Sequence, residues 1–297
     1  ALSDGWGGSM IATEVSDILF GTPTPRATTY NVGVLKADQV NIVVHGHNPV
    51  VSEMVLAACL SPKLQEAARK KGASGINLAG VCCTGNELLM RHGVAMAGNH
   101  LSTELVLATG AVDLMLVDYQ CIMPSLATVA GRFHTKMVAT SDKASFPGMA
   151  HRVFHPENAA ALAAELVAEA VENFPRRGAV HIPVEPVEAL GGFSVEAILA
   201  ALGGTPAPLI EAIKAGQIQG AVGIVGCNNP KIKQDYGHVT LARRLIAQDI
   251  LVVDTGCAAV ANAKAGLKTA AAAREAGPGL KAVCEALGIP PVLHMGS

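Results

Sequence analysis

The sequence is short of charged and aromatic residues. Charged residues make up 15% of the 297 residues, aromatic residues make up 3%, and the formal net charge is −2. A chain with so little net charge has no basic excess that would attract nucleic acid or an anionic membrane surface. We therefore expect no nucleic-acid partner.

Several sequence patterns are also missing. No apolar run reaches the 18 or so residues of a membrane span, and the opening ALSDGWGGSM lacks the basic and apolar regions of a secretory signal. Neither GxGxxG nor GxxxxGK[ST] occurs, so a dinucleotide or P-loop site has no motif to support it. The chain starts without Met and stops at HMGS directly after an apolar run, so we expect it to be cut from something longer.

The cysteine pattern does not resemble that of a secreted disulfide scaffold. There are seven cysteines, an odd number, with no CxxC pair and with glycines around them. Small secreted domains instead carry cysteines at regular spacings that pair into disulfides. A reducing compartment fits better, and we expect a cytoplasmic protein.

Aliphatic and small residues dominate, and 50% of the chain is hydrophobic. Buried parallel strands appear as continuous aliphatic runs, and from about residue 37 such runs alternate with helical patterns. This alternation predicts an α/β fold with doubly wound, Rossmann-like parallel sheets. We expect the end of a helical region at 1–36, one Rossmann-like domain at 37–186, and a second, truncated one at 187–297.

The expected elements can be given by their ranges. Strands are predicted at 41–47, 76–81, 112–118, 136–140, 218–226, 250–256 and 291–296. One helix is predicted from Pro49 to the basic RKKGA, followed later by a loop at VAMAGNH and helices at 156–174, 194–202, 208–215 and 237–248.

Five strand-like runs end at a soft or borderline metal ligand. They are NIVVHGH ending at His47, INLAGVCC at Cys83, VDLMLVDYQC at Cys121, IQGAVGIVGC at Cys227 and ILVVDTGC at Cys257. In open α/β sheets, ligands bind outside the carboxyl ends of the strands, so these residues can meet in one cleft. Four thiolates and an imidazole exceed the four ligands of a structural zinc. We therefore predict a metal–sulfur cluster.

A free cysteine that follows a buried strand is most often a small core residue. A cluster is favoured only because four of the seven cysteines lie at strand ends. Cys59 and Cys284 lie on apolar faces of predicted helices, so we expect them in the core. Cys82 adjoins Cys83, and neighbouring side chains of an extended backbone point apart. We therefore expect only one of these two thiols to face the cluster.

His45 and His47 alternate at one strand end and so lie on the same side. One of them can be a ligand, and the other can hold a ligand in place or handle protons.

Six motifs follow one another along the chain: HGHNPV, GVCCTGNE, DYQCIMPS, VGCNNPKIKQDYGH, VDTGC and PPVLHMGS. In this order they closely resemble the catalytic subunit of anaerobic nickel–iron carbon monoxide dehydrogenase, and most nearly the bacterial forms that partner acetyl-CoA synthase. The resemblance covers essentially all 297 residues.

The resemblance implies a nickel–iron–sulfur cluster, the C-cluster. His47 and Cys83 correspond to ligands of the iron outside the cubane, and Cys121, Cys227 and Cys257 correspond to ligands of the three cubane irons. The nickel-ligating cysteine of the family would be the residue after Ser297, and the [4Fe-4S] relay clusters would have their ligands outside this chain.

The implied reaction is the reversible oxidation of CO with water to CO2, two protons and two electrons. The resemblance also implies a ferredoxin-like electron carrier, a homodimer and an acetyl-CoA synthase partner. Because relay and proton-handling residues of the family lie in absent segments, we expect the chain alone to be inactive.

Two alternatives remain at this point. The hybrid-cluster protein, or hydroxylamine reductase, shares the fold and a related cluster, but it has GHD in place of HGHNP and needs glutamate ligands that we do not find here. The other alternative is a non-catalytic α/β scaffold whose cysteines are core residues.

Overall fold

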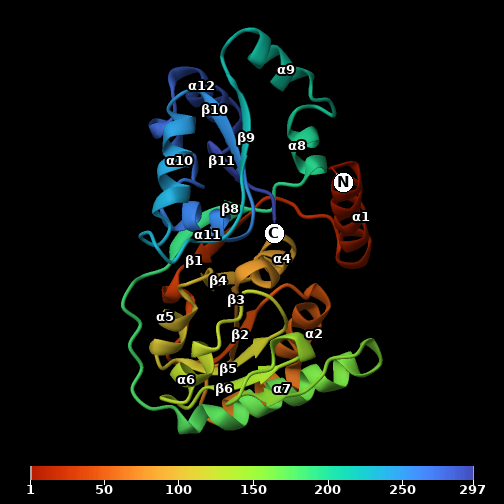
Figure 1. The fold of residues 1–297 in the computed structure, drawn as a ribbon, viewed down its shortest axis with the longest axis vertical. Coiled ribbons are helices and arrows are strands. Elements are labelled where there is room, and N and C mark those ends of the chain that lie inside the picture. The colour runs from red at the N-terminus through yellow and green to blue at the C-terminus, as the bar shows by residue number, and fades with distance from the viewer. Residues whose placement is uncertain (1, 297) are drawn as a thin grey trace.

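The computed structural model describes residues 2–296, in which helices and strands alternate along most of the chain (Figure 1). The helices are α1 Leu2–Phe20, α2 Pro49–Cys59, α3 Pro62–Lys70, α4 Cys82–His92, α5 Thr103–Ala108, α6 Ser125–Ala130, α7 Ala159–Asn173, α8 Val195–Ala201, α9 Ala207–Lys214, α10 Tyr236–Ile246, α11 Gly256–Lys264 and α12 Pro278–Leu287. The strands are β1 Arg26–Tyr30, β2 Val40–His45, β3 Ile76–Val81, β4 Ala95–Gly98, β5 Val112–Val117, β6 Lys136–Ala139, β7 Ala150–His151, β8 Val187–Gly191, β9 Gly220–Ile224, β10 Ile250–Asp254 and β11 Val292–His294.

The larger sheet is mainly parallel. Within residues 2–296 its eight strands run in the order β7-β6-β5-β2-β3-β4-β1-β8, and only β8 is antiparallel to its neighbour, β1. Every side chain of β2 is buried, as expected of a central strand covered on both faces. The predicted α/β fold with a parallel sheet is confirmed.

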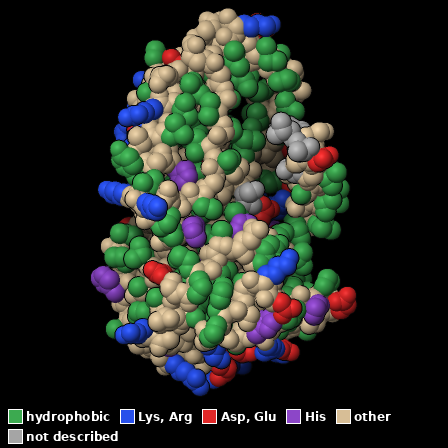
Figure 2. Space-filling view, viewed as in Figure 1, with side chains coloured by type: hydrophobic (Ala, Val, Ile, Leu, Met, Phe, Trp, Pro, Cys, Tyr) green, Lys and Arg blue, Asp and Glu red, His purple; other side chains and the backbone are tan. Residues whose placement is uncertain are grey.

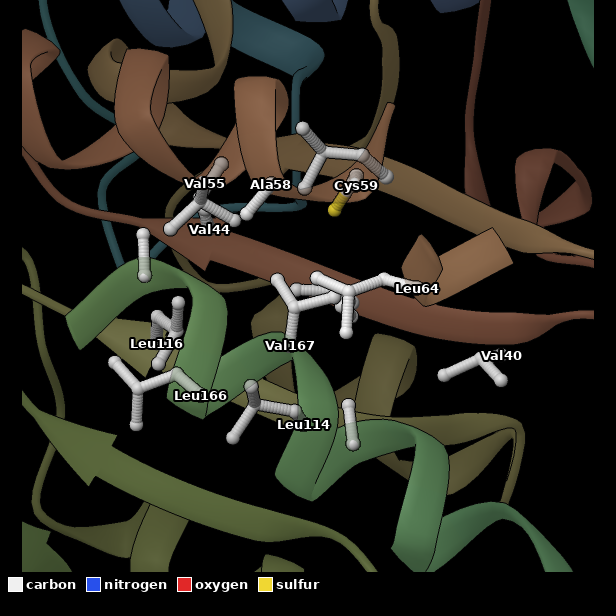
Figure 3. Packing of buried hydrophobic residues seen from close by; sticks show 14 of the residues in the cluster. Val40, Val44, Val55, Ala58, Cys59, Leu64, Leu114, Leu116, Leu166 and Val167 are labelled. Atoms are coloured by element: carbon white, nitrogen blue, oxygen red, sulfur yellow. The ribbon is translucent and has the colours of Figure 1, made fainter. Parts of the chain in front are cut away.

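Alternate side chains of the central strands enter two different cores. Val44 of β2 and Leu116 of β5 pack with α2 and α7, where Figure 3 shows them beside Val55 and Leu166. The next residue back along β2, Val43, belongs to the core on the opposite face, which α5 and α6 cover. This alternation follows from the two-residue period of a strand, and it gives the large sheet helices on both faces.

The smaller sheet is parallel throughout, in the order β11-β10-β9. Its core contains Val252 of β10, Val292 of β11, Ile246 of α10 and Leu280 of α12. In Figure 1 this sheet and its helices form the upper part of the molecule, above the large sheet. No helix of the described chain, residues 2–296, is both long and apolar enough to cross a bilayer.

Charged side chains of both signs gather at the end of the molecule formed by α7 (Figure 2). They include exposed ion pairs such as Lys71–Glu172 at 2.6 Å and Lys136–Glu169 at 3.4 Å. Such exposed pairs contribute little stability. They form a solvated face rather than a patch of one sign.

Four strands were not predicted, and one of them, β7, is only two residues long. β1 lies in residues expected to be helical, β8 starts at the expected boundary at residue 187, and β4 lies in the expected VAMAGNH loop. β1 reads RATTY and β4 reads AMAG, so neither has the aliphatic run that identified the other strands. The domain limits remain a prediction, although β1 and β8 place two strands of the large sheet outside 37–186.

The single helix expected from Pro49 is interrupted. Pro49 begins α2 with Asn48 as its N-cap, and Pro62 begins a separate helix, α3. Proline fits the first turn of a helix but not its interior, because it lacks the backbone N–H. The prediction missed this second start.

Buried polar groups lie where the two sheets meet. Asp254 at the end of β10 forms an ion pair with Lys268, both side chains are 0% exposed, and Asn262 Nδ2 donates to Asp254 Oδ2 at 2.9 Å. Nearby, Tyr30 of the large sheet hydrogen-bonds through its hydroxyl to Nδ1 of His294 at 3.1 Å. Burial raises the pKa of Asp254 and lowers the pKa of Lys268, and each partner opposes the shift of the other.

We predict that Lys268→Met lowers the free energy of unfolding by about 3–5 kcal/mol, because it leaves a buried carboxylate without its cation. Urea unfolding followed by circular dichroism measures the loss. The matched control is Lys281→Met, whose ion pair with Glu285 at 3.9 Å is exposed; its expected effect is below about 1 kcal/mol. Equal effects of the two substitutions would contradict the prediction.

Candidate metal centre

The five predicted ligands come from the carboxyl ends of five strands in two sheets. His47, Cys83 and Cys121 follow β2, β3 and β5 of the large sheet, while Cys227 and Cys257 follow β9 and β10 of the small sheet. Within each sheet these strands are parallel neighbours, so their carboxyl ends share one edge. The two edges therefore supply the two halves of the site.

The side chains of these residues meet. The imidazole of His47 is within hydrogen-bonding reach of the thiols of Cys121 and Cys83. The Cys227 thiol reaches that of Cys121, and it also reaches that of Cys257. A continuous series of contacts thus links all five predicted residues, although they span more than 200 positions of the sequence.

The contacts stabilise a charged pair. Hydrogen bonds with Cys121, and then with Cys83, raise the pKa of His47 to about 10. The contact with Cys82, followed by that with His47, lowers the pKa of Cys121 to about 4. The arrangement therefore favours the thiolate form of Cys121, which is the form of cysteine that binds metals.

The expectation that only one of Cys82 and Cys83 faces the site is wrong. Cys82 begins α4 with a φ of 60°, so its backbone is not extended as the prediction assumed. Its thiol is fully buried and contacts those of Cys121 and Cys257, while Cys83 contacts His47. The tight turn from β3 into α4 directs both thiols into the site.

His45 supports the loop that carries Cys121. It is buried, its Nε2 lies 3.2 Å from the backbone oxygen of Cys121, and burial lowers its pKa to about 4. A neutral imidazole that donates from Nε2 holds this loop in place. This geometry agrees with the expectation that one of the two histidines positions a ligand, and a role in proton handling remains a prediction.

Asp118 was not predicted from the sequence, yet it shapes the loop of His47. Its carboxylate accepts the backbone N–H of His47 at 2.6 Å and that of Asn48 at 2.8 Å. Gly46 has a φ of 137°, and a Cβ there would lie 1.9 Å from Asp118 Oδ1. Only glycine therefore permits this close turn. The acidic residue directly after β5 was a signal that could have been used.

Helix α4 sits unusually close to β3 because two glycines touch. A Cβ on Gly85 would lie 2.6 Å from the Cα of Gly80. The next residue of α4, Asn86, donates from Nδ2 to the backbone oxygen of Gly256 at 3.1 Å. These contacts fix the start of α4, and with it Cys82 and Cys83, against the loop before Cys257.

The donor set suits a cluster better than a single ion. Within residues 2–296 no three His, Cys, Asp or Glu side chains are arranged to hold one metal ion. Thiolates are the ligands of iron–sulfur clusters, and here they enter from separate strand ends. In addition, Nδ1 of His47 is buried without a hydrogen-bond partner. These residues fit a multi-metal core with several points of attachment.

The two cysteines expected in the core are there. Cys59 is 3% exposed and Cys284 is 1% exposed, and Figure 3 shows Cys59 among Ala58 and Leu64. Neither contacts the centre. The distinction that the sequence drew between strand-end and helical cysteines is therefore confirmed.

A comparison with known proteins places the chain in a family. All residues from 1 to 297 match the model of the Prismane/CO dehydrogenase family. The chain belongs to that family.

Named relatives and a solved structure agree. The chain is 60% identical over 299 residues to carbon monoxide dehydrogenase 1 of Methanosarcina acetivorans, covering 100% of this chain and 48% of the relative. It is 42% identical over 315 residues to the carbon monoxide dehydrogenase/acetyl-CoA synthase subunit beta of Moorella thermoacetica, with coverage of 100% and 46%. The Ni-free, as-isolated crystal structure of carbon monoxide dehydrogenase from Thermococcus sp. AM4 superposes with a TM-score of 0.97 at 56% identity, covering 100% of this chain and 47% of that one.

The chain thus spans about half the length of the relatives it matches. The term full-length protein denotes a protein of the relatives' length that contains this chain.

The Gly80–Gly85 contact gives a prediction about the centre. Helix propensity alone would make Gly85→Ala stabilising by about 1 kcal/mol. We expect the opposite, a loss of about 1–3 kcal/mol, because the added methyl group would push α4 away from β3. Chemical unfolding measures the change. Gly178→Ala is the control, since a Cβ at Gly178 would meet nothing within 4 Å. A stabilising Gly85→Ala would contradict the close packing.

Proposed function

We propose that the chain is part of an anaerobic nickel–iron carbon monoxide dehydrogenase, which oxidises CO reversibly with water to CO2, two protons and two electrons. The observation that carries the proposal is the meeting of five strand ends at one thiol-rich centre. The names of the relatives support it. They also favour it over a hybrid-cluster protein or a non-catalytic scaffold.

We propose that a nickel–iron–sulfur cluster binds at this centre through His47, Cys83, Cys121, Cys227 and Cys257. When bound, the cluster supplies Lewis-acid activation of CO and water and takes up two electrons. The donor set supports this assignment because thiolate and imidazole suit iron and nickel. Further [4Fe-4S] clusters would have their ligands in the rest of the full-length protein.

The chain's own residues would keep these ligands in place. Asp118 fixes the backbone that presents His47, and His45 fixes the loop of Cys121. The backbone N–H of His100 donates to the sulfur of Cys257 at 3.3 Å. An N–H donor stabilises negative charge on the thiolate. Three of the five ligands, His47, Cys121 and Cys257, thus have their backbone or sulfur fixed by a hydrogen bond from another segment.

The proposal includes the partners of the reaction. CO, CO2 and water are the substrates, and a ferredoxin-like protein carries the electrons. A homodimer, a cytoplasmic location, a Rossmann-like description of both sheet units and an acetyl-CoA synthase partner belong to the proposal as well. The relative named with acetyl-CoA synthase is 42% identical, against 60% for carbon monoxide dehydrogenase 1 of Methanosarcina acetivorans.

Substitutions at the centre test the function. In the full-length protein, produced without oxygen, Cys121→Ser and Cys227→Ser are expected to lower bound nickel and iron and CO-dependent viologen reduction by at least about tenfold. Elemental analysis and the viologen assay measure both. Cys59→Ser, at a core cysteine, is the control and is expected to retain metal and activity. A wild-type protein that binds no nickel, or a Cys121→Ser variant with unchanged metal content, would refute the proposal.

A further inference from the structure

A dense polar cluster lies between the loops that carry Cys227 and Cys257. Its centre is Asp235, whose Oδ1 accepts Nδ2 of Asn99 at 2.9 Å and Nδ2 of Asn228 at 3.0 Å. Its Oδ2 pairs with Nζ of Lys264 at 2.5 Å. The Asp235 and Lys264 side chains are only 15% and 21% exposed. The adjacent Gln234 also donates from Nε2 to Oδ1 at 3.2 Å, so one carboxylate receives four donors, three of them from separate segments of the chain.

Two of the donors, Asn228 and Lys264, belong to the segments that carry predicted ligands. Asn228 directly follows Cys227, and its Oδ1 accepts the backbone N–H of Asp235 at 2.7 Å. Lys264 is the last residue of α11, whose first turn holds Cys257. Asp235 thus connects the two ligand loops of the small sheet.

Asn99 extends the cluster to the large sheet. Besides contacting Asp235, its Nδ2 donates to the backbone oxygen of Cys257 at 3.1 Å. It belongs to the loop after β4, and the next residue, His100, donates its backbone N–H to the Cys257 sulfur at 3.3 Å. Asn99 therefore binds both Asp235 and Cys257, and this double contact fixes Cys257 relative to the large sheet.

Asp235 has an uncommon backbone conformation for a residue with a side chain. Its φ is 64°, in the left-handed region that non-glycine residues seldom adopt. Asp235 is the N-cap residue of α10, yet its side chain makes no capping hydrogen bond to that helix. Helix capping, the usual reason for an aspartate at this position, therefore does not explain it.

We propose that Asp235 is a positioning residue that holds Cys227 and Cys257 at the separation that the metal cluster requires. The inference rests on the proposed function, because it assigns these two cysteines as ligands. Asp235 contacts neither thiol and acts through Asn228, Asn99 and Lys264. Polar groups that orient metal ligands commonly change metal affinity about 10- to 100-fold when they are removed.

The small-sheet part offers a matched control at Asp249. Its φ is 58°, also left-handed, and its carboxylate accepts the backbone N–H of Leu280 at 2.8 Å at the start of α12. It lies before β10, at the end of the strand opposite to Cys257. Glycine adopts left-handed φ without strain, so Asp→Gly at either position removes the carboxylate and keeps the backbone.

The experiment compares Asp235→Gly, Asp235→Asn and Asp249→Gly with the wild type in the full-length protein, purified without oxygen. Nickel and iron per chain, the electron paramagnetic resonance spectrum of the reduced protein and its melting temperature are measured. Asp235→Gly is expected to lower nickel content about tenfold or more and to change the spectrum. Asp235→Asn keeps an acceptor oxygen for Asn99 and Asn228, so it should recover part of the metal. Asp249→Gly should lower the melting temperature and leave metal content and spectrum unchanged.

The outcomes separate the two proposals. Wild-type metal content and spectrum in Asp235→Gly would overturn the positioning role and leave the proposed function standing. An equal spectral change in Asp249→Gly would also overturn the role, because it would indicate a general loss of structure. A wild-type protein without nickel and iron would overturn the proposed function and this inference with it. If Asp235→Gly does not fold, Asn228→Ala replaces it, because it removes the side-chain link between Asp235 and the Cys227 loop. Wild-type metal content and spectrum in Asn228→Ala would then overturn the role.

Discussion

The structure depends on the parallel direction of the strands that lead into the centre. A parallel pair delivers both chains to the same edge of the sheet, and here β2, β3 and β5 do so in one sheet and β9 and β10 in the other. Antiparallel pairing would send every second loop to the far edge. The buried contact of Tyr30 with His294 then joins the two sheets where these edges meet.

Bringing several thiols together has an electrostatic and a conformational cost. Neighbouring thiolates repel one another, so they require cations or N–H donors such as His47 and the backbone of His100. The backbone is also strained there. Cys82, Gln120 and Cys121 all have positive φ, and such conformations persist only where the surrounding structure holds them. Strained residues and candidate ligands therefore occupy the same short loops.

The sequence was informative where one physical effect dominated. Strand β3 was predicted with both limits correct, because INLAGV is a continuous aliphatic run between helical patterns. The five candidate ligands followed from the rule that chemistry gathers at the carboxyl ends of strands. Strands β1 and β4 were missed because they form only through neighbours that are distant in sequence. Small or polar residues give such strands no pattern of their own.

The residues that the sequence did not reveal share a cause. Cys82 enters the centre because its backbone turns to a φ of 60°. The carboxylates of Asp118 and Asp235 accept N–H groups from loops that are distant in the sequence. Asp118, for example, accepts the backbone N–H of His47, which lies 71 residues earlier. No local periodicity records either effect. The position of Asp118 after a strand can be recognised in the sequence, but the loops that these carboxylates hold can be identified only after the order of the strands is known.

Without a bound ligand, the loops of the large sheet are held more firmly by hydrogen bonds and burial than the Cys227 loop of the small sheet. His45 and Asp118 hold the large-sheet loops through buried hydrogen bonds, and Cys257 is itself buried in the start of α11. Cys227, in contrast, is exposed and follows β9, an edge strand with three exposed residues in succession. A ligand that binds both halves adds its binding free energy to the stability of their arrangement. Most of this added stability concerns the Cys227 loop, because the other loops are already held in place. Asp235 connects the Cys227 loop to the rest of the centre through its hydrogen bonds with Asn228 and Asn99.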